Sequence, residues 1–188
     1  MNLIRYLIRK IIALFKRLEK VYYDELSNDI ITRMKSCGDD VIVRGPCNIT
    51  GVGKVSLGNN VTIGANAYIK AEGGLIIGNN VSISRNLVLY TINHNYKGKR
   101  LPYDESQIKK QVVIEDNVWI GMNVCITPGS HIEEGAIIGM GTTVTGRVPA
   151  RAIIGSQSWR VLKYRDEEHY NKLISNSMYG DTTGRKYP

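Results

Sequence analysis

The sequence is poor in the residues that build an aromatic core or a disulfide framework. It has one phenylalanine, two tryptophans and three cysteines in 188 residues. An odd number of cysteines without a C-x-x-C pair predicts neither a disulfide scaffold nor a zinc site, and a reducing cytoplasm is the simplest location. Eleven tyrosines and 19 glycines are present instead. A core of small and β-branched side chains is therefore expected, which favours β structure.

A long uncharged hydrophobic run is also missing. Arg5, Arg9 and Lys10 interrupt the apolar N-terminal stretch, and no small-residue cleavage site follows it. We therefore expect neither a signal peptide nor a transmembrane span. On a helical wheel, residues 3–22 form an amphipathic helix with its apolar side chains in one arc and its basic side chains opposite. Such a helix packs against its own domain or a neighbouring subunit, or lies peripherally on an anionic membrane surface.

The formal net charge of +8 predicts an anionic partner, which charge alone does not identify. Five cations crowd the segment 97–110, but no aromatic stacking motif accompanies them. Nucleic acid is therefore not the expected partner. A phosphorylated cofactor or an anionic membrane fits the charge as well.

Aliphatic residues recur at a period of six, which no α-helix has. Positions 114, 120, 126, 132, 138 and 144 read Ile, Ile, Ile, Ile, Ile and Val, and a small residue follows four positions after each. The same period runs through residues 57–75 and, after a two-residue insertion, through residues 77–89. Three such hexapeptides close a triangular coil of short strands. Gly121 and Gly139 follow aliphatic positions, where we expect turns with positive φ.

One long interruption breaks the period between Leu89 and Ile114. Its sequence, TINHNYKGKRLPYDESQIKKQ, is polar, basic and rich in turn residues. An excursion of this length from a regular rod is more often functional than accidental, although a scaffold without chemistry is the alternative. The expected organisation is a helical segment at 1–36, a β-helix at 37–158 with a protruding loop at about 94–112, and a C-terminal helix and tail at 159–188.

Two stretches carry a resemblance to a known family. They are VVIEDNVWIGMNVCITPGSHIEEGAIIGMGTTVTGRVPARAIIG and LVLYTINHNY, and the resemblance covers about residues 58–163. Here the chain is similar to hexapeptide-repeat acetyltransferases, especially the galactoside, maltose and polysaccharide O-acetyltransferases. The resemblance implies an all-β fold, a left-handed parallel β-helix with an N-terminal amphipathic helix and a short C-terminal helix. It also implies a homotrimer with active sites between subunits and acetyl-CoA as co-substrate.

The resemblance further implies the site residues. His94 would be the general base, because imidazole can take a proton from a hydroxyl near neutral pH. The backbone amides of Gly121 and Met122 would meet the developing oxyanion. Cofactor contacts would come from Trp119, Met140, Thr145, Arg160 and Lys163. Acceptor contacts would come from Glu72, Asn66 and Arg100.

The expected function is therefore acetyl-CoA-dependent O-acetylation of a sugar or polysaccharide precursor. It is placed in the cytoplasm or at the inner face of the membrane, and no metal is required. An amine of an amino sugar, a xenobiotic acceptor, or a longer acyl group are the alternatives within acyl transfer. A zinc-dependent carbonic anhydrase of this fold is excluded, because His94, His131 and His169 lack the close-spaced pair of ligands. A nucleotidyltransferase would need an N-terminal nucleotide domain, for which the N-terminal segment is too short.

Overall fold

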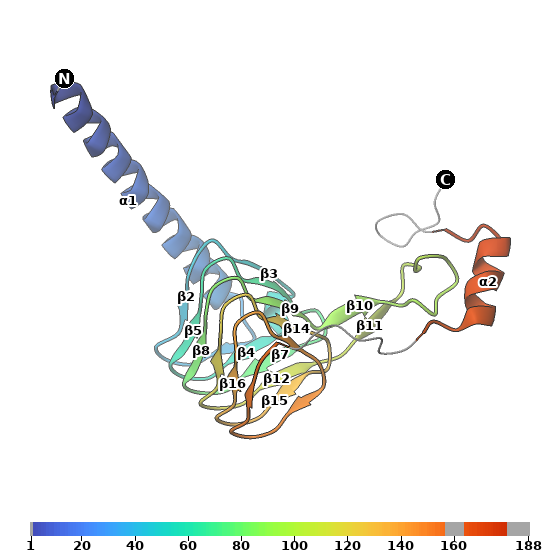
Figure 1. Ribbon diagram of the computed structural model, residues 1–188. Coiled ribbons are helices and arrows are strands. Elements are labelled where there is room, and N and C mark those ends of the chain that lie inside the picture. Colours follow the sequence, from blue (N-terminus) through green and yellow to red (C-terminus); the bar gives the residue numbers. More distant parts are fainter. Residues whose placement is uncertain (1, 157–163, 180–188) are drawn as a thin grey trace.

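The computed structural model describes residues 2–156 and 164–179, which form a β-solenoid of about six turns with helical and hairpin appendages (Figure 1). Each complete coil gives one short strand to each of three parallel sheets. Sheet 1 contains β1 (Ser36–Cys37), β4 (Val55–Leu57), β7 (Leu75–Ile77), β12 (Val112–Ile114), β15 (His131–Ile132) and β18 (Arg147–Val148). Sheet 2 contains β2 (Ile42–Val43), β5 (Val61–Ile63), β8 (Val81–Ile83), β13 (Trp119–Ile120), β16 (Ile137–Ile138) and β19 (Ile153–Ile154). Sheet 3 contains β3 (Asn48–Thr50), β6 (Tyr68–Lys70), β9 (Val88–Tyr90), β14 (Cys125–Ile126) and β17 (Thr143–Val144).

The hexapeptide period predicted the core of this solenoid, and the structure confirms it. The aliphatic residues at 114, 120, 126, 132, 138 and 144 are all at most 2% exposed. Small side chains fill the corners, and Val118, Ser130 and Ala136 are buried there. In register, each coil stacks on the next, as where Ile120 pairs with Ile83 and Ile138. Burying each such aliphatic side chain contributes roughly 1.5–3 kcal/mol, so the stacked column is the main source of stability.

The corners place asparagine or glycine at positive φ, at Asn123 and Gly141, two residues after the glycines named in the sequence. Asn66, Asn86 and Asn123 stack at the corner between sheets 2 and 3, all with positive φ. Their side-chain amides form a ladder of hydrogen bonds of 3.1 and 2.8 Å. The expectation of positive φ at Gly121 and Gly139 was wrong. Those glycines instead allow close approach of coils, since a Cβ on Gly121 would lie 2.7 Å from the backbone nitrogen of the next coil.

Helix α1 (Asn2–Thr32) projects away from the first coil (Figure 1). It continues ten residues beyond the amphipathic stretch 3–22 and lies within the helical segment predicted at 1–36. Residues 3–22 are exposed, so the described chain does not bury that stretch. Among its described side chains, those of the base anchor the helix, through Ser27 and Ile30, which are buried. Tyr23 lies against Gly45, where an added Cβ would come within 2.5 Å of it. Across the described residues, no helix combines the length and the apolar character that crossing a bilayer requires.

The long interruption forms a hairpin that projects sideways from the solenoid (Figure 1). Strands β10 (Ile92–His94) and β11 (Gln107–Lys109) pair antiparallel, with His94 opposite Gln107. Helix α2 (Glu167–Ser175) lies beside the hairpin tip, and its His169 bonds through Nε2 to the Gly98 carbonyl at 3.0 Å.

The predicted C-terminal helix starts later than expected. Residues 164–166 are not helical, and the earlier part of the prediction lies outside the described residues. The helix begins at Glu167 because Asp166 caps it, its carboxylate accepting the His169 N–H at 2.7 Å.

Candidate active site

One edge of the solenoid, where sheet 3 turns into sheet 1, collects the departures from the hexapeptide period. We call it the irregular edge, made by residues 51–54, 71–74 and 91–111. The first is the 3₁₀ helix η1 (Val52–Lys54), the second a turn, and the third the hairpin. Thr91 ties two of them together, since its buried hydroxyl accepts the Gly73 N–H at 2.7 Å and donates to the Lys70 carbonyl at 2.8 Å. The hairpin therefore rises from a fixed base.

The predicted general base, His94, stands at the end of β10 on this edge. Its ring stacks on Tyr103, with the ring centroids 3.7 Å apart and the planes inclined by 16°. Its backbone N–H donates to the Asn93 side chain at 2.9 Å. Its Nδ1 atom is buried and has no hydrogen-bond partner among the described residues. The imidazole is thus oriented by ring stacking, and no structural hydrogen bond from the described residues holds its Nδ1 atom.

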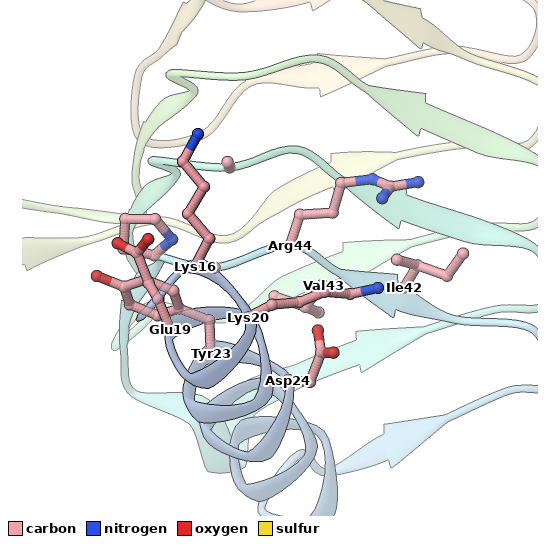
Figure 2. Close-up of a pocket in the computed structure, with 11 residues that line it drawn as sticks. Lys16, Glu19, Lys20, Tyr23, Asp24, Ile42, Val43 and Arg44 are labelled. Atoms are coloured by element: carbon pink, nitrogen blue, oxygen red, sulfur yellow. The ribbon is translucent and has the colours of Figure 1, made fainter. Parts of the chain in front are cut away.

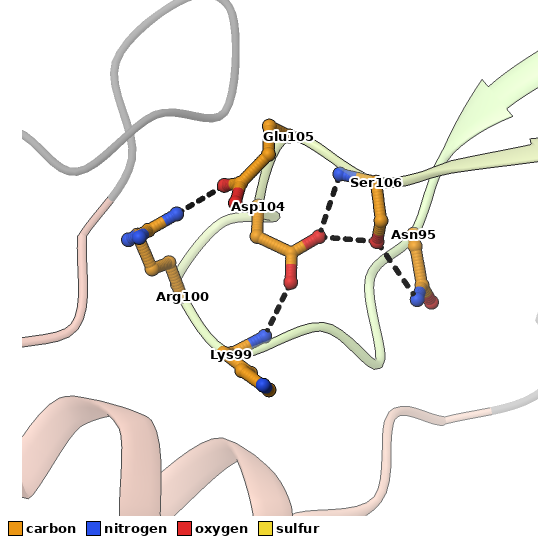
Figure 3. Close-up of polar contacts among 6 residues, drawn as sticks. All are labelled: Asn95, Lys99, Arg100, Asp104, Glu105 and Ser106. Carbon is orange, nitrogen blue, oxygen red and sulfur yellow. Dashed lines mark hydrogen bonds and ion pairs between the residues drawn. The ribbon is translucent and has the colours of Figure 1, made fainter.

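Asp104 organises the hairpin tip beyond His94 (Figure 3). The Asp104 carboxylate accepts the Lys99 N–H at 2.7 Å, the Ser106 N–H at 2.9 Å and the Ser106 hydroxyl. These hydrogen bonds, first among them the one from the Ser106 hydroxyl, hold the pKa of Asp104 below its ordinary value. Arg100, predicted to bind the acceptor, forms an ion pair with Glu105 in the same tip.

Glu72, another predicted acceptor residue, lies in the turn of the irregular edge one coil before the hairpin. Its Oε2 atom is buried without a hydrogen-bond partner among the described residues. Close by on sheet 3, Tyr68 and Tyr90 form an aromatic pair with centroids 6.0 Å apart. Burial, together with the proximity of Tyr68 and Glu72, raises the pKa of Tyr90 above its ordinary value. A carboxylate beside two aromatic faces suits a polyol ring.

Asn66 is not brought to this edge. It lies at the corner between sheets 2 and 3, where its amide donates to Asn86 in the asparagine ladder. The predicted acceptor set is therefore dispersed within one chain: Glu72 lies on the irregular edge, Arg100 at the hairpin tip and Asn66 on a different edge.

The residues predicted to contact the cofactor, as far as the structure describes them, also lie on two different parts of the solenoid. Trp119 on β13 is 55% exposed, and Met140 at the next corner is 69% exposed. Met122 lies directly below Met140, with its carbonyl accepting the Gly141 N–H at 2.9 Å. Thr145, by contrast, follows β17 on the side of the solenoid where sheet 3 turns into sheet 1. Arg160 and Lys163 lie outside the described residues.

The two amides predicted to stabilise an oxyanion differ in their availability. The Gly121 N–H donates to the Ile138 carbonyl at 2.8 Å as part of the stacking of coils. The Met122 N–H has no backbone acceptor among the described residues. Of the pair, Met122 is the amide that remains for a ligand.

No group of histidine, cysteine and acidic side chains that could hold a metal ion occurs among residues 2–156 and 164–179. The histidine that pairs most closely with a carboxylate is His131, which contacts Glu115 at 2.6 Å on sheet 1. That pair lies apart from His94, on a regular strand.

Sequence reasoning missed Tyr103 and Asp104, which orient His94 and the hairpin tip. It also missed the platform of Tyr68 and Tyr90. The tip residues follow no repeat, so no periodic signal could place Tyr103 on the His94 ring. The tyrosine pair was detectable in principle, because Tyr68 and Tyr90 are 22 residues apart and the early coils repeat about every 20 residues, as in the Asn60 to Asn80 hydrogen bond.

Two family models match this chain. The model described as bacterial transferase hexapeptide (six repeats) matches residues 111–146, and the hexapeptide repeat of succinyl-transferase matches residues 54–91. The matched segments flank the hairpin, so both halves of the solenoid carry the family's repeat.

Among curated proteins, the galactoside O-acetyltransferase of Escherichia coli is 36% identical over 64 residues, which are 32% of this chain and 32% of that protein. A 2,3,4,5-tetrahydropyridine-2,6-dicarboxylate N-acetyltransferase of Staphylococcus aureus is 41% identical over 56 residues, which are 30% of this chain and 23% of that protein. The match thus spans at most about a third of these relatives.

Among solved structures, a hexapeptide-repeat acetyltransferase of Vibrio cholerae has a TM-score of 0.63 at 23% identity, covering 77% of this chain and 89% of that one. The same protein complexed with acetyl coenzyme A has a TM-score of 0.51 at 21% identity, with coverages of 77% and 85%. At this level of identity the likeness concerns the fold.

Proposed function

This chain belongs to the hexapeptide-repeat acetyltransferase family, and from that premise we propose that it is an acyltransferase using acetyl-CoA. The donor is supported by the Vibrio cholerae relative, which was solved with acetyl coenzyme A. The acceptor we propose is a hydroxyl of a sugar or polysaccharide precursor. The observation that carries the proposal is His94, which stacks on Tyr103 at the irregular edge and whose Nδ1 atom has no hydrogen-bond partner in residues 2–156 and 164–179.

In the proposed reaction, His94 takes the proton from the acceptor hydroxyl as the oxygen attacks the thioester carbonyl carbon. The carbon–sulfur bond breaks, CoA leaves as the thiolate, and the imidazolium returns the proton to its sulfur. The Met122 amide, which has no backbone acceptor among the described residues, would donate to the carbonyl oxygen as it becomes negative. Holding both substrates in line supplies much of the rate enhancement.

We further propose that the active site forms between subunits of a homotrimer. His94 and Glu72 lie on the irregular edge, whereas Trp119, Met122 and Met140 lie on sheet 2 and its following corner. Exposed apolar side chains gathered in one region are typical of a surface that a partner or ligand covers. A neighbouring copy that presents its sheet 2 to this irregular edge would complete one site from two chains.

The sugar acceptor is supported by two observations. Glu72 keeps a buried carboxylate oxygen without a partner among the described residues, beside the ring pair of Tyr68 and Tyr90. The similarity to a galactoside O-acetyltransferase points the same way. An amino-sugar acceptor is the second candidate, favoured by the similarity to an N-acetyltransferase.

The test is release of CoA thiol from acetyl-CoA in the presence of neutral sugars, glycan fragments and amino sugars. We expect release with a hydroxyl acceptor, and a loss of about 10²–10⁴-fold in kcat for His94→Ala with little change in the KM for acetyl-CoA. The matched control is His131→Gln, which removes the other imidazole on the solenoid and should keep full activity. Equal loss in both variants, or no thiol release with any acceptor, would contradict the proposal, whereas release only with amino sugars would establish N-acetyl transfer.

A further inference from the structure

Helix α1 carries an apolar surface that nothing in the described chain covers. At about 100° per residue, its apolar side chains occupy an arc of roughly 140°. Leu3, Ile4 and Phe15 are 71%, 68% and 68% exposed. The members of this apolar arc are Leu3, Ile4, Leu7, Ile8, Ile11, Leu14, Phe15, Leu18, Val21 and Tyr22, all of them exposed. A surface of this extent is normally occupied by a partner or a membrane.

The helix meets the solenoid through a different face. Tyr23, Ser27 and Ile30 anchor its base, and on the wheel they lie opposite the apolar arc. Lys16 and Lys20 line a pocket together with Ile42 and Val43 of β2, and Lys20 extends toward Ile42 (Figure 2). The apolar arc therefore faces away from the solenoid, and a surface applied to it would not collide with the rest of the chain.

The charges on the helix are of one sign around this arc. Residues 2–18 hold five cations and no acidic residue, the first acid being Glu19. These cations are Arg5, Arg9, Lys10, Lys16 and Arg17, and all are exposed. A one-signed basic face beside a broad apolar face is the pattern of a helix that lies in an anionic bilayer interface.

A bundle of copies of this helix fits the pattern less well. A coiled-coil seam uses two positions in seven, which is narrower than this arc. The positions bordering the arc include Arg5, Lys10 and Arg17, with Glu19 the only acid among them. Parallel copies would thus place cations beside cations along the first four turns, where pairing normally needs opposite charges.

We propose that α1 docks the protein on an anionic lipid bilayer. The apolar arc enters the boundary between headgroups and acyl chains, the flanking cations contact the lipid phosphates, and the solenoid stays on the aqueous side. The helix then serves as an anchor that holds the irregular edge near membrane-bound material. This inference is independent of the proposed chemistry, because it concerns residues 2–26 alone.

The experiment is co-sedimentation of the full chain with vesicles, comparing equimolar phosphatidylglycerol and phosphatidylcholine with phosphatidylcholine alone. We expect binding to the anionic vesicles that weakens as salt is added. The informative pair is Phe15→Glu against Ala13→Glu. Both add one negative charge to the helix, but Ala13 lies among the cations and Phe15 in the arc. Phe15→Glu should lower the partition coefficient at least about 10-fold more than Ala13→Glu does.

A second pair isolates the charge. Arg5→Gln with Arg9→Gln should weaken anionic binding by roughly 25-fold, at about fivefold for each cation. Lys35→Gln with Lys109→Gln removes the same charge from exposed sites off the helix and should leave binding unchanged.

Circular dichroism confirms folding of each variant. Absence of binding to anionic vesicles, or equal effects of Phe15→Glu and Ala13→Glu, overturns the proposal. If the unaltered protein does not bind vesicles and Phe15→Glu dissociates an oligomer, the apolar arc is an interface between copies of this chain instead.

Discussion

At the scale of single residues, Tyr103 controls the orientation of the proposed base. Its ring covers one face of the His94 imidazole at 3.7 Å, and such stacking contributes about 0.5–1.5 kcal/mol. We expect Tyr103→Ala to lower kcat by roughly 10-fold with the KM for acetyl-CoA nearly unchanged, since positioning rather than binding is lost. Tyr103→Phe keeps the ring and should restore most of the rate.

A remote tyrosine provides the comparison. Tyr164 is 84% exposed and lies outside the hairpin, so Tyr164→Ala should leave both kinetic constants unchanged. A Tyr103→Ala variant with the kcat of the unaltered protein would show that stacking does not orient the base.

Asp104 makes the hairpin tip sensitive to acid. Because hydrogen bonds hold its folded-state pKa below the ordinary value of 3.8, the carboxylate stabilises the folded tip fully above that value. The stabilisation is lost as the pH falls through the lower folded-state pKa. The protection factors of the amides in residues 95–106, which correct the exchange rate for its intrinsic pH dependence, should therefore stay constant from about pH 7 to about pH 5 and fall only in stronger acid.

Asp104→Asn tests the same point without changing the pH. It presents an amide to donors that need an acceptor, so the tip should lose about 1–3 kcal/mol of local stability at neutral pH. The protection factors of its tip should be low already at neutral pH and should not fall further in acid. Rapid exchange of the unaltered tip at neutral pH, or unchanged exchange in Asp104→Asn, would contradict the role given to this carboxylate.

At the scale of elements, Gly73 fixes how closely the turn of the irregular edge approaches the hairpin base. A Cβ there would overlap the Thr91 carbonyl oxygen, whereas a Cβ on Gly53 of the same edge meets no atom within 4 Å. Gly73→Ala should therefore lower the free energy of unfolding by about 1–3 kcal/mol and reduce activity. Gly53→Ala should change it by no more than about 0.5 kcal/mol. Equal melting temperatures for the two variants would show that the turn can shift at no cost.

The sequence predicted the elements in which one packing pattern repeats along the chain. A buried aliphatic side chain in each short strand produces the period of six, and the solenoid strands from β4 to β9 and from β12 to β18 follow it. The roles of glycine and asparagine at the corners were not separable, because close approach and positive φ both favour residues with little or no side-chain hindrance. The amphipathic pattern covered only residues 3–22 of α1, since the base of the helix is buried on another face than the apolar arc.

The candidate site was predictable to the extent that it rests on the solenoid. Trp119 occupies β13, whose register the repeat determines, whereas His94 stands in the hairpin strand β10 and was placed by the family resemblance of LVLYTINHNY. Arg100 was placed by distance along the chain, but the fold of the tip pairs it with Glu105. Asn66 was placed by counting along strands, and the corner ladder takes its amide. Both depend on local hydrogen bonding that hydrophobic periodicity does not encode.

At the scale of the whole molecule, the separation of the site residues onto two regions makes the proposed trimer testable by mixing. In that proposal, a working site takes His94 from one chain and Trp119 from its neighbour. His94→Ala and Trp119→Ala proteins should each be nearly inactive when acetyl-CoA is limiting. Refolding them together allows mixed trimers, in which some interfaces combine an intact His94 with an intact Trp119.

For equal amounts that mix at random, about a quarter of the interfaces regain both residues, so activity should return to about a quarter of that of the unaltered protein. If both residues served a site within one chain, mixing would give only the average of the two weak activities. Light scattering of each variant checks that the assembly is unchanged. Because complementation requires two chains at one site, its appearance would connect the irregular edge of one copy to sheet 2 of another.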